Sequence, residues 1–245
     1  EYYFVGGMPE AVTTFLETND ANQVRRVQEN ILFLYRSDMS KHVSAEEATR
    51  IGMVWQSIPS QLAKENKKFV YGAVRKGARA KDFETAIQWL VDAGLIYKVS
   101  RVREVGMPLK FYEDVNAFKL FLLDVGLLGA ISEMEPAQML MSNNAMTESK
   151  GAFTENYVLS QLKTLSGIAT YYYSREDSRL GVDFVVQHQG HVIPVEVKAE
   201  ENLKSKSLKA FMDKHENLHA VRLSMSPYRE QDWLTNYPLY AVREI

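Results

Sequence analysis

The chain has 245 residues, of which 46% are hydrophobic and 24% are charged, and its formal net charge is −2. These values are typical of a soluble globular protein with one large domain or two modest ones. The absence of cysteine excludes disulfides and thiolate zinc sites. No apolar run approaches the length of a membrane span and no signal-peptide pattern is present, so we expect a cytoplasmic protein.

Positive charge is concentrated in one part of the chain. Residues 41–112 contain 13 basic and 7 acidic residues, whereas residues 1–40 and 113–150 are acidic overall. Such asymmetry indicates an acidic partner such as DNA, although a solvated basic surface would give the same counts.

The first part of the chain is predicted to be helical. Residues 9–38 read as helix, residues 45–63 carry apolar side chains at helical spacing, and Phe69–Lys76 forms a second, short helix. Asp82 can cap a third helix, whose apolar stripe ends at Gly94 as the residue after its C-cap.

Two extended runs follow, Leu95–Arg103 and Leu109–Tyr112. Three helices before a β-hairpin is the order of a winged helix, whose third helix would read DNA. Lys76, Arg79 and Lys81 are then the candidate nucleic-acid-binding residues. The alternative is that this fold serves protein contacts, because Glu84 and Asp92 on the third helix are poor phosphate ligands.

The next segment contains the most apolar run of the chain. Phe118–Leu128 is predicted to be a buried helix, and residues 132–149 a loop-rich connection. A helix over residues 152–165 carries Glu155 on its apolar stripe. Burying this carboxylate unpaired would cost several kcal/mol, roughly, so it needs a partner, for which a metal ion or Lys198 are candidates. The alternative is an acid that favours the helix dipole.

A hairpin is predicted over Gly181–Lys198, after a strand at Thr170–Ser174. If Gln189 and Gly190 form its tip, facing residues have numbers that sum to 379. Asp183 then opposes Glu196, with Cβ atoms about 5 Å apart, and the two carboxylates repel. Alternation places Glu196 and Lys198 on one face. A divalent cation such as Mg²⁺ would relieve the repulsion, although many hairpins carry such residues on a solvated face.

The remaining elements complete an order of helix, strand, hairpin, helix and strand. They are a helix at Ser205–His215, a strand at His219–Ser224 and a last strand at Leu239–Arg243.

This order, with Glu155 on the first helix, Asp183 on the second strand and Glu196-Val197-Lys198 on the third, resembles the PD-(D/E)XK nuclease superfamily. The chain as a whole also resembles an uncharacterised domain that follows an AAA-type ATPase in many bacterial and archaeal proteins. That second likeness is carried by Gly6-Gly7-Met8-Pro9-Glu10, Phe118-Lys119-Leu120, Leu123–Leu128, Gly151–Asn156, Val182-Asp183-Phe184 and Pro194–Lys198. One position departs from the pattern, because Gly181 stands where the family often has Glu.

The resemblance implies an α+β chain in which a helical N-terminal part with a winged helix precedes a restriction-endonuclease-like α/β domain with a mixed sheet. Residues 1–40 would be a helical linker after an ATPase domain upstream of Glu1, 41–130 the winged-helix-like domain and 145–245 the nuclease-like domain. The chain itself has no ATP site, because Gly72–Gly77 is followed by Ala78-Arg79 where a P-loop needs Lys-Ser/Thr.

The expected function is nucleic-acid engagement with Mg²⁺-dependent phosphodiester hydrolysis. In that mechanism Asp183 and Glu196 hold the metal, Glu155 orients a metal or a water, and Lys198 stabilises developing charge. The alternative function is that of a catalytically inert nuclease-fold module that couples an ATPase to a partner. In that case the same acids form a structural network.

Overall fold

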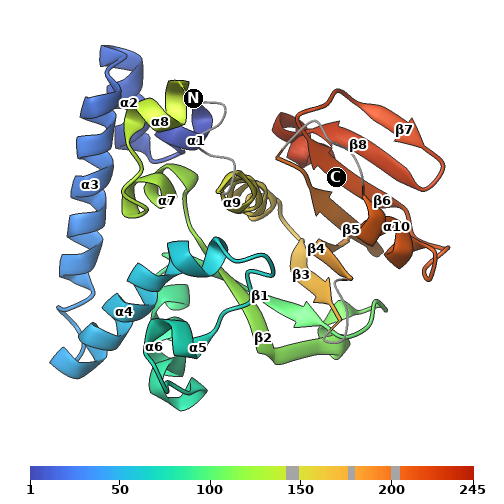
Figure 1. Cartoon of the computed structure of the whole chain (residues 1–245), viewed down its shortest axis with the longest axis horizontal. Coiled ribbons are helices and arrows are strands. Elements are labelled where there is room, and N and C mark those ends of the chain that lie inside the picture. The colour runs from blue at the N-terminus through green and yellow to red at the C-terminus, as the bar shows by residue number, and fades with distance from the viewer. Residues whose placement is uncertain (142–148, 176–179, 200–204) are drawn as a thin grey trace. The chain divides into compact units, whose positions relative to one another are not determined.

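A computed structural model describes residues 1–141, 149–175, 180–199 and 205–245 (Figure 1). The chain is α+β and forms two compact units. The first comprises Glu1–Lys98 and Lys119–Asn156, and the second comprises Val99–Phe118 and Tyr157–Ile245. The predicted ranges 1–40, 41–130 and 145–245 stay a prediction, since compact units and family domains need not coincide.

Helices make up most of the first unit. They are α1 (Tyr2–Val5), α2 (Pro9–Thr18), α3 (Ala21–Asp38), α4 (Ala45–Leu62), α5 (Tyr71–Val74), α6 (Ala80–Asp92), α7 (Val125–Ile131), α8 (Pro136–Met141) and the start of α9 (Lys150–Leu162). The helical structure predicted for residues 9–38 is confirmed, and it is divided between α2 and α3. Asn19 adopts a left-handed φ of 49° and ends α2, and Asp20 caps α3 by accepting a hydrogen bond from Asn22 N at 2.8 Å.

The predicted helix over residues 45–63 is confirmed as α4, and its start is capped by Ser44 Oγ, which accepts a hydrogen bond from Glu47 N. The predicted cap of α6 is placed three residues too late. Asp82 lies inside the first turn, where its Oδ2 accepts a hydrogen bond from Arg79 N at 2.8 Å. The predicted end at Gly94 is confirmed by a hydrogen bond from Leu95 N to Leu90 O.

The apolar run 118–128 is not one helix. Its first half continues strand β2 (Glu113–Leu122), and its second half begins α7. Asp124 causes the change, because its Oδ1 accepts a hydrogen bond from Leu127 N at 2.9 Å and caps α7. A run buried on both faces is equally apolar as strand or as helix, so its composition does not separate the two. The extended structure predicted for Leu109–Tyr112 is wrong, because these residues form a short 3₁₀ helix, η1.

The N-terminal glycines of the first unit pack against Asp124. Gly7 N donates a hydrogen bond to Asp124 Oδ2 at 2.7 Å. A Cβ at Gly6 would lie 2.3 Å from Asp124 Oδ1, and one at Gly126 would lie 2.6 Å from Val5 O. The segments 6–10 and 123–128, far apart in sequence, are therefore in contact and require small residues there.

A mixed eight-stranded sheet runs in the order β2-β1-β3-β4-β5-β6-β8-β7. Neighbouring strands are parallel in β1/β3, β5/β6 and β6/β8, and antiparallel in β3/β4, β4/β5 and β7/β8. The strand bounds are β1 (Ile96–Val102), β3 (Ala169–Ser174), β4 (Gly181–His188), β5 (His191–Val197), β6 (Ala220–Ser224), β7 (Arg229–Gln231) and β8 (Leu234–Pro238). The strand predicted at 239–243 is instead a 3₁₀ helix, η2 (Leu239–Glu244), which begins after Pro238. Strands β7 and β8 were not predicted, because they are short and contain few apolar residues.

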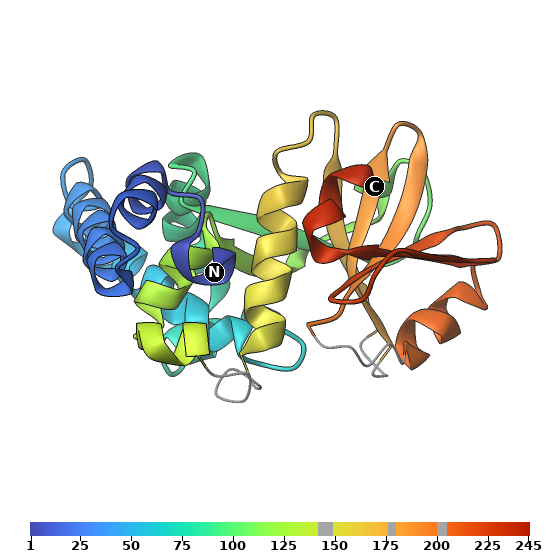
Figure 2. The same cartoon turned by 90° about the horizontal axis from the view of Figure 1, so that it is seen from above.

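The core of the second unit lies between α10 (Lys206–Met212) and the sheet. Phe211 and Leu208 of α10 are buried against Val182, Val185 and Val192 of the hairpin. Figure 2 shows these C-terminal elements from a second direction, in orange and red. Among the described residues, no helix combines the length and the apolar character needed to cross a membrane.

Candidate functional site

The predicted hairpin register is confirmed. Paired positions run from Phe184↔Val195 to His188↔His191, so facing numbers sum to 379. Gln189 and Gly190 form the tip with positive φ values of 46° and 81°, as a two-residue hairpin turn requires.

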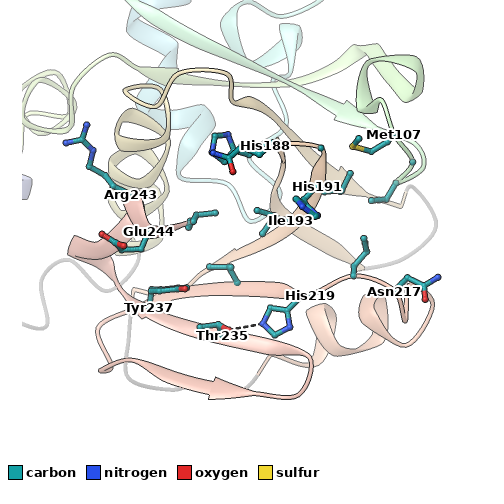
Figure 3. A pocket seen from close by; sticks show the side chains of 18 residues that line it. Met107, His188, His191, Ile193, Asn217, His219, Thr235, Tyr237, Arg243 and Glu244 are labelled. Carbon is teal, nitrogen blue, oxygen red and sulfur yellow. Dashed lines mark hydrogen bonds between the residues drawn. The ribbon is translucent and has the colours of Figure 1, made fainter.

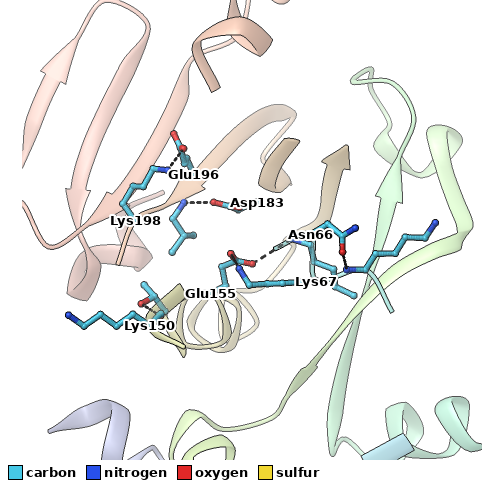
Figure 4. Close-up of polar contacts among 11 residues, drawn as sticks. Asn66, Lys67, Lys150, Glu155, Asp183, Glu196 and Lys198 are labelled. Atoms are coloured by element: carbon cyan, nitrogen blue, oxygen red, sulfur yellow. Dashed lines mark hydrogen bonds and ion pairs between the residues drawn. The ribbon is translucent and has the colours of Figure 1, made fainter. Parts of the chain in front are cut away.

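Asp183 lies one position beyond this ladder, at a β-bulge between β3 and β4. On the other side of β4, the register with β3 shifts by one residue, so that Asp183 and Phe184 together oppose Tyr172. The carboxylate of Asp183 turns toward the end of β5, where its Oδ2 accepts a hydrogen bond from Val197 N at 2.8 Å (Figure 4). Asp183 is therefore held beside the residue that follows Glu196.

Glu196 and Lys198 lie on the same face of the hairpin, as the alternation predicted. Lys198 Nζ is 2.8 Å from Glu196 Oε1 (Figure 4). Glu196 is 7% exposed, and its Oε2 is buried without a hydrogen bond from any described residue. A buried acceptor without a partner is costly, so this oxygen is where a cation or a donor from a ligand would be favoured.

Arg222 is a site residue that the sequence analysis missed. The parallel pairing of β5 and β6 places it next to Glu196, and it is 4% exposed. Its Nε donates a hydrogen bond to Asn236 Oδ1 at 3.0 Å. Burial lowers the pKa of Arg222, whereas the attraction of Glu196 opposes that shift. The sequence did contain a signal for this residue, which is an arginine between the apolar residues of a predicted strand. Such an arginine is buried only where it has partners, so its position indicates a polar network.

Asn236 fixes this arginine through a buried polar network. It accepts a second hydrogen bond from Ser224 Oγ at 2.8 Å, and its amide nitrogen donates to Pro227 O at 2.9 Å. Ser205 Oγ accepts a further bond from Arg222 at 3.3 Å. The guanidinium beside Glu196 is therefore held in one orientation.

Glu155 belongs to the first unit, where it is bound by two lysines. Lys67 Nζ is 2.5 Å from its Oε1, and Lys119 Nζ is 3.5 Å from its Oε2. Figure 4 shows Lys67 directed at the carboxylate. Burial acts to raise the pKa of Glu155, but the attraction of Lys119 and Lys67 outweighs it and the pKa lies below its usual value. The inference that this buried acid needs a partner is correct, while neither lysine was foreseen.

The neighbouring Asn156 joins the same helix to β2. Its Oδ1 accepts a hydrogen bond from Leu122 N at 2.9 Å, and its Nδ2 donates to Leu122 O at 3.1 Å. Glu155 binds Lys119 of the same strand. The motifs Phe118-Lys119-Leu120 and Gly151–Asn156 are thus two sides of one buried interaction.

Two carboxylates, those of Asp183 and Glu196, are available as ligands of a divalent cation. Within the ranges that the structure describes, no cluster of three or more acidic, His or Cys residues could hold a metal ion. Mg²⁺, however, is often bound by one or two carboxylates, with waters and phosphate oxygens completing its shell. Asp183 and Glu196 fit that requirement, and the unsatisfied Oε2 of Glu196 is the observation that supports it.

The basic candidates Lys76, Arg79 and Lys81 are all exposed in the first unit. Lys76 precedes α6, Arg79 is its N-cap residue and Lys81 lies in its first turn. They form a positively charged group at one end of a helix, and a role in binding nucleic acid stays a prediction.

A separate pocket of about 920 Å³ lies at the hairpin tip of the second unit (Figure 3). His188, His191, His219 and Arg243 are among the residues that line it. His219 Nε2 is hydrogen-bonded to Thr235 Oγ1 at 2.8 Å. None of the predicted site residues contributes to this pocket.

Residues 1–138, more than half of the chain, match a family described as a domain of unknown function, DUF8612. The chain belongs to the DUF8612 family. Residues 150–242 also match a second domain of unknown function, DUF4143. No curated protein and no solved structure matches the chain. Lys67 and Lys119 lie in the DUF8612 match and bind Glu155 of the DUF4143 match, so two ion pairs that share one buried carboxylate join the two matched segments.

Proposed function

We propose that this chain engages nucleic acid and hydrolyses phosphodiester bonds at the base of the β4–β5 hairpin, with Mg²⁺ bound by Asp183 and Glu196. The observation that carries the proposal is the buried Oε2 of Glu196, which accepts no hydrogen bond from a described residue. Leaving such a group unsatisfied costs about 1–3 kcal/mol, and a bound cation would offset that cost.

The residues around these acids have separable roles. The metal would supply Lewis-acid polarisation of a phosphoryl oxygen. Lys198, held by Glu196 at 2.8 Å, places an ammonium group where negative charge develops on a phosphate. Arg222 positions Glu196 from the adjacent strand. The hydrogen bond from Val197 N orients Asp183.

Glu155 has a structural role in this proposal, in contrast to the expectation from the sequence. Lys67 and Lys119 bind its two oxygens separately, and the carboxylate is 4% exposed. A carboxylate neutralised in this way is a poor candidate for orienting a metal or a water.

The N-terminal part contributes binding in the same proposal. The succession of α4, α5 and α6 before β1 and β2 is the element order expected for a winged helix. Lys76, Arg79 and Lys81 would contact phosphates. The chain would serve as the C-terminal module of an AAA-type ATPase that lies upstream in the same polypeptide.

Metal-dependent thermal melting tests the hairpin site. The wild type is expected to melt at a higher temperature in Mg²⁺ or Mn²⁺, because a ligand at 100 times its Kd stabilises the folded state by about 2.7 kcal/mol. Asp183→Asn and Glu196→Gln should lose that rise, whereas Asp213→Asn, at an exposed acid of the same unit, should keep it. A parallel assay of metal-dependent cleavage of labelled DNA tests the chemistry. A wild type whose melting ignores both metals would contradict the proposal.

The second candidate is a catalytically inert nuclease-fold module that couples the ATPase to a partner. It is favoured by the ion pair of Lys198 with Glu196, which neutralises Glu196 without a metal. The sign of one stability change separates the candidates. If Asp183 and Glu196 repel, Asp183→Asn stabilises the metal-free protein. If Asp183 is part of a closed network, the same substitution destabilises it.

A further inference from the structure

A shallow basic groove of about 470 Å³ lies on the second unit between α10 and strands β6 to β8. Lys206 and Lys209 of α10 line it, together with Trp233 of the turn between β7 and β8. Arg222 also lines the groove, and Asp213 is the acidic residue in its described lining. Three cations and one carboxylate are among these residues, and Lys209 Nζ is paired with that carboxylate, 2.8 Å from Asp213 Oδ1. The lining keeps a net positive charge that favours an anionic ligand.

Trp233 adds an aromatic ring to the positively charged groove. Its ring is partly exposed, and Lys209 Nζ lies 4.9 Å from the ring centre. A positively charged groove with an aromatic side chain beside the cations is the arrangement that binds single-stranded nucleic acid. The cations bind the phosphates and the ring stacks on a base. An acidic peptide offers carboxylates to the cations, but a nucleic-acid strand offers an anion and a flat ring in every unit.

Arg222 connects this groove to the candidate metal site. It lines the groove and is also the neighbour of Glu196 across two parallel strands. The groove therefore ends at the residue that pairs with Glu196, although Glu196 itself does not line it.

We propose that this groove binds the backbone of a single nucleic-acid strand, with Lys206 and Lys209 contacting phosphates and Trp233 stacking on a base. The proposal rests on the proposed nucleic-acid function and adds to it the binding surface and the single-stranded form of the substrate. It places strand binding on α10 and the turn between β7 and β8, in addition to the residues preceding and beginning α6.

The test is fluorescence anisotropy of a labelled oligothymidylate in EDTA, which separates binding from any metal-dependent step. Lys206→Glu with Lys209→Glu is expected to weaken binding at least tenfold and to lower the salt slope by about 1.4, which is about 0.7 for each phosphate bound on a single strand. The matched control Lys214→Glu reverses a charge just beyond α10 that does not line the groove, and it should change affinity less than threefold. Trp233→Leu, checked for an unchanged melting temperature, should weaken binding without changing the salt slope.

Other outcomes would contradict strand binding by the groove or the single-stranded form of its ligand. Equal losses in the double variant and in the control, or competition by polyglutamate as effective as that by unlabelled oligothymidylate, would overturn strand binding by the groove. Duplex DNA that binds more tightly than the single strand would overturn the assignment of substrate form. If binding fails in EDTA while metal still raises the melting temperature, the groove proposal fails and the metal site survives.

Discussion

Lys119 and Glu155 form a buried ion pair within the first unit, with Nζ 3.5 Å from Oε2 and both side chains 6% exposed. Lys67 completes the arrangement from a loop, where it adopts a left-handed φ of 51°. A non-glycine residue in that conformation costs of order 1–3 kcal/mol, which the ion pair offsets. The three side chains bind the start of α9 to β2 and to the loop after α4.

Removing one partner of this network should be strongly destabilising. Glu155→Gln leaves two ammonium groups without their counter-charge, so we expect the free energy of unfolding to fall by about 3–5 kcal/mol. Lys67→Met should cost less, because the Lys67 side chain is 13% exposed and reaches water. Urea unfolding of Lys119→Met, Glu155→Gln and the double variant gives the coupling energy. Additive effects in the double variant would show that the two residues do not interact.

The same carboxylate predicts a pH dependence. The pKa of Glu155 is lower in the folded protein than its unfolded value of about 4.3. Its contribution is therefore fully present above the unfolded pKa and is lost as the pH falls through the folded pKa. The wild type should lose more unfolding free energy than Glu155→Gln between neutral pH and the acid side of pH 4. Parallel pH curves for the two proteins would contradict this assignment.

Gly6 should not tolerate a side chain. A Cβ there would lie 2.3 Å from Asp124 Oδ1, and the backbone φ of 73° is itself unfavourable for alanine. We expect Gly6→Ala to destabilise the protein by more than about 2 kcal/mol. Gly72→Ala is the control, because its Cβ would meet nothing within 4 Å, and in helix α5 it should be neutral or stabilising by up to about 1 kcal/mol. Equal melting temperatures for the two variants would contradict the close approach of Gly6 to Asp124.

Charge reversal tests the basic group before and at the start of α6. Glutamate at Lys76, Arg79 and Lys81 together should weaken duplex DNA binding and lower its salt slope by about one for each phosphate that these side chains no longer bind. Reversal of three other exposed cations of the first unit, Arg26, Arg36 and Lys41, provides the matched control. Unchanged affinity and slope in the first variant would remove this helix from the binding surface and favour a protein-binding role.

Local patterns determined much of this protein in advance. Helix α4 follows from the helical spacing of its apolar residues, and the hairpin register follows from two turn residues between alternating strands. The common face of Glu196 and Lys198 follows from the same alternation. These features depend on residues close in sequence, whose geometry is set by the backbone repeat itself.

Tertiary structure decided which side chains meet. Glu155 is bound by Lys67, 88 positions away, and by Lys119, 36 positions away, so no local pattern could identify either partner. Arg222 lies beside Glu196 only through the parallel pairing of β5 with β6, and Asp183 accepts a hydrogen bond from Val197 N, 14 positions away, beyond the last ladder pair. The hydrophobic pattern specifies that each segment is buried, but it does not specify its neighbours. A buried charge is stable only beside the partner that the complete fold provides.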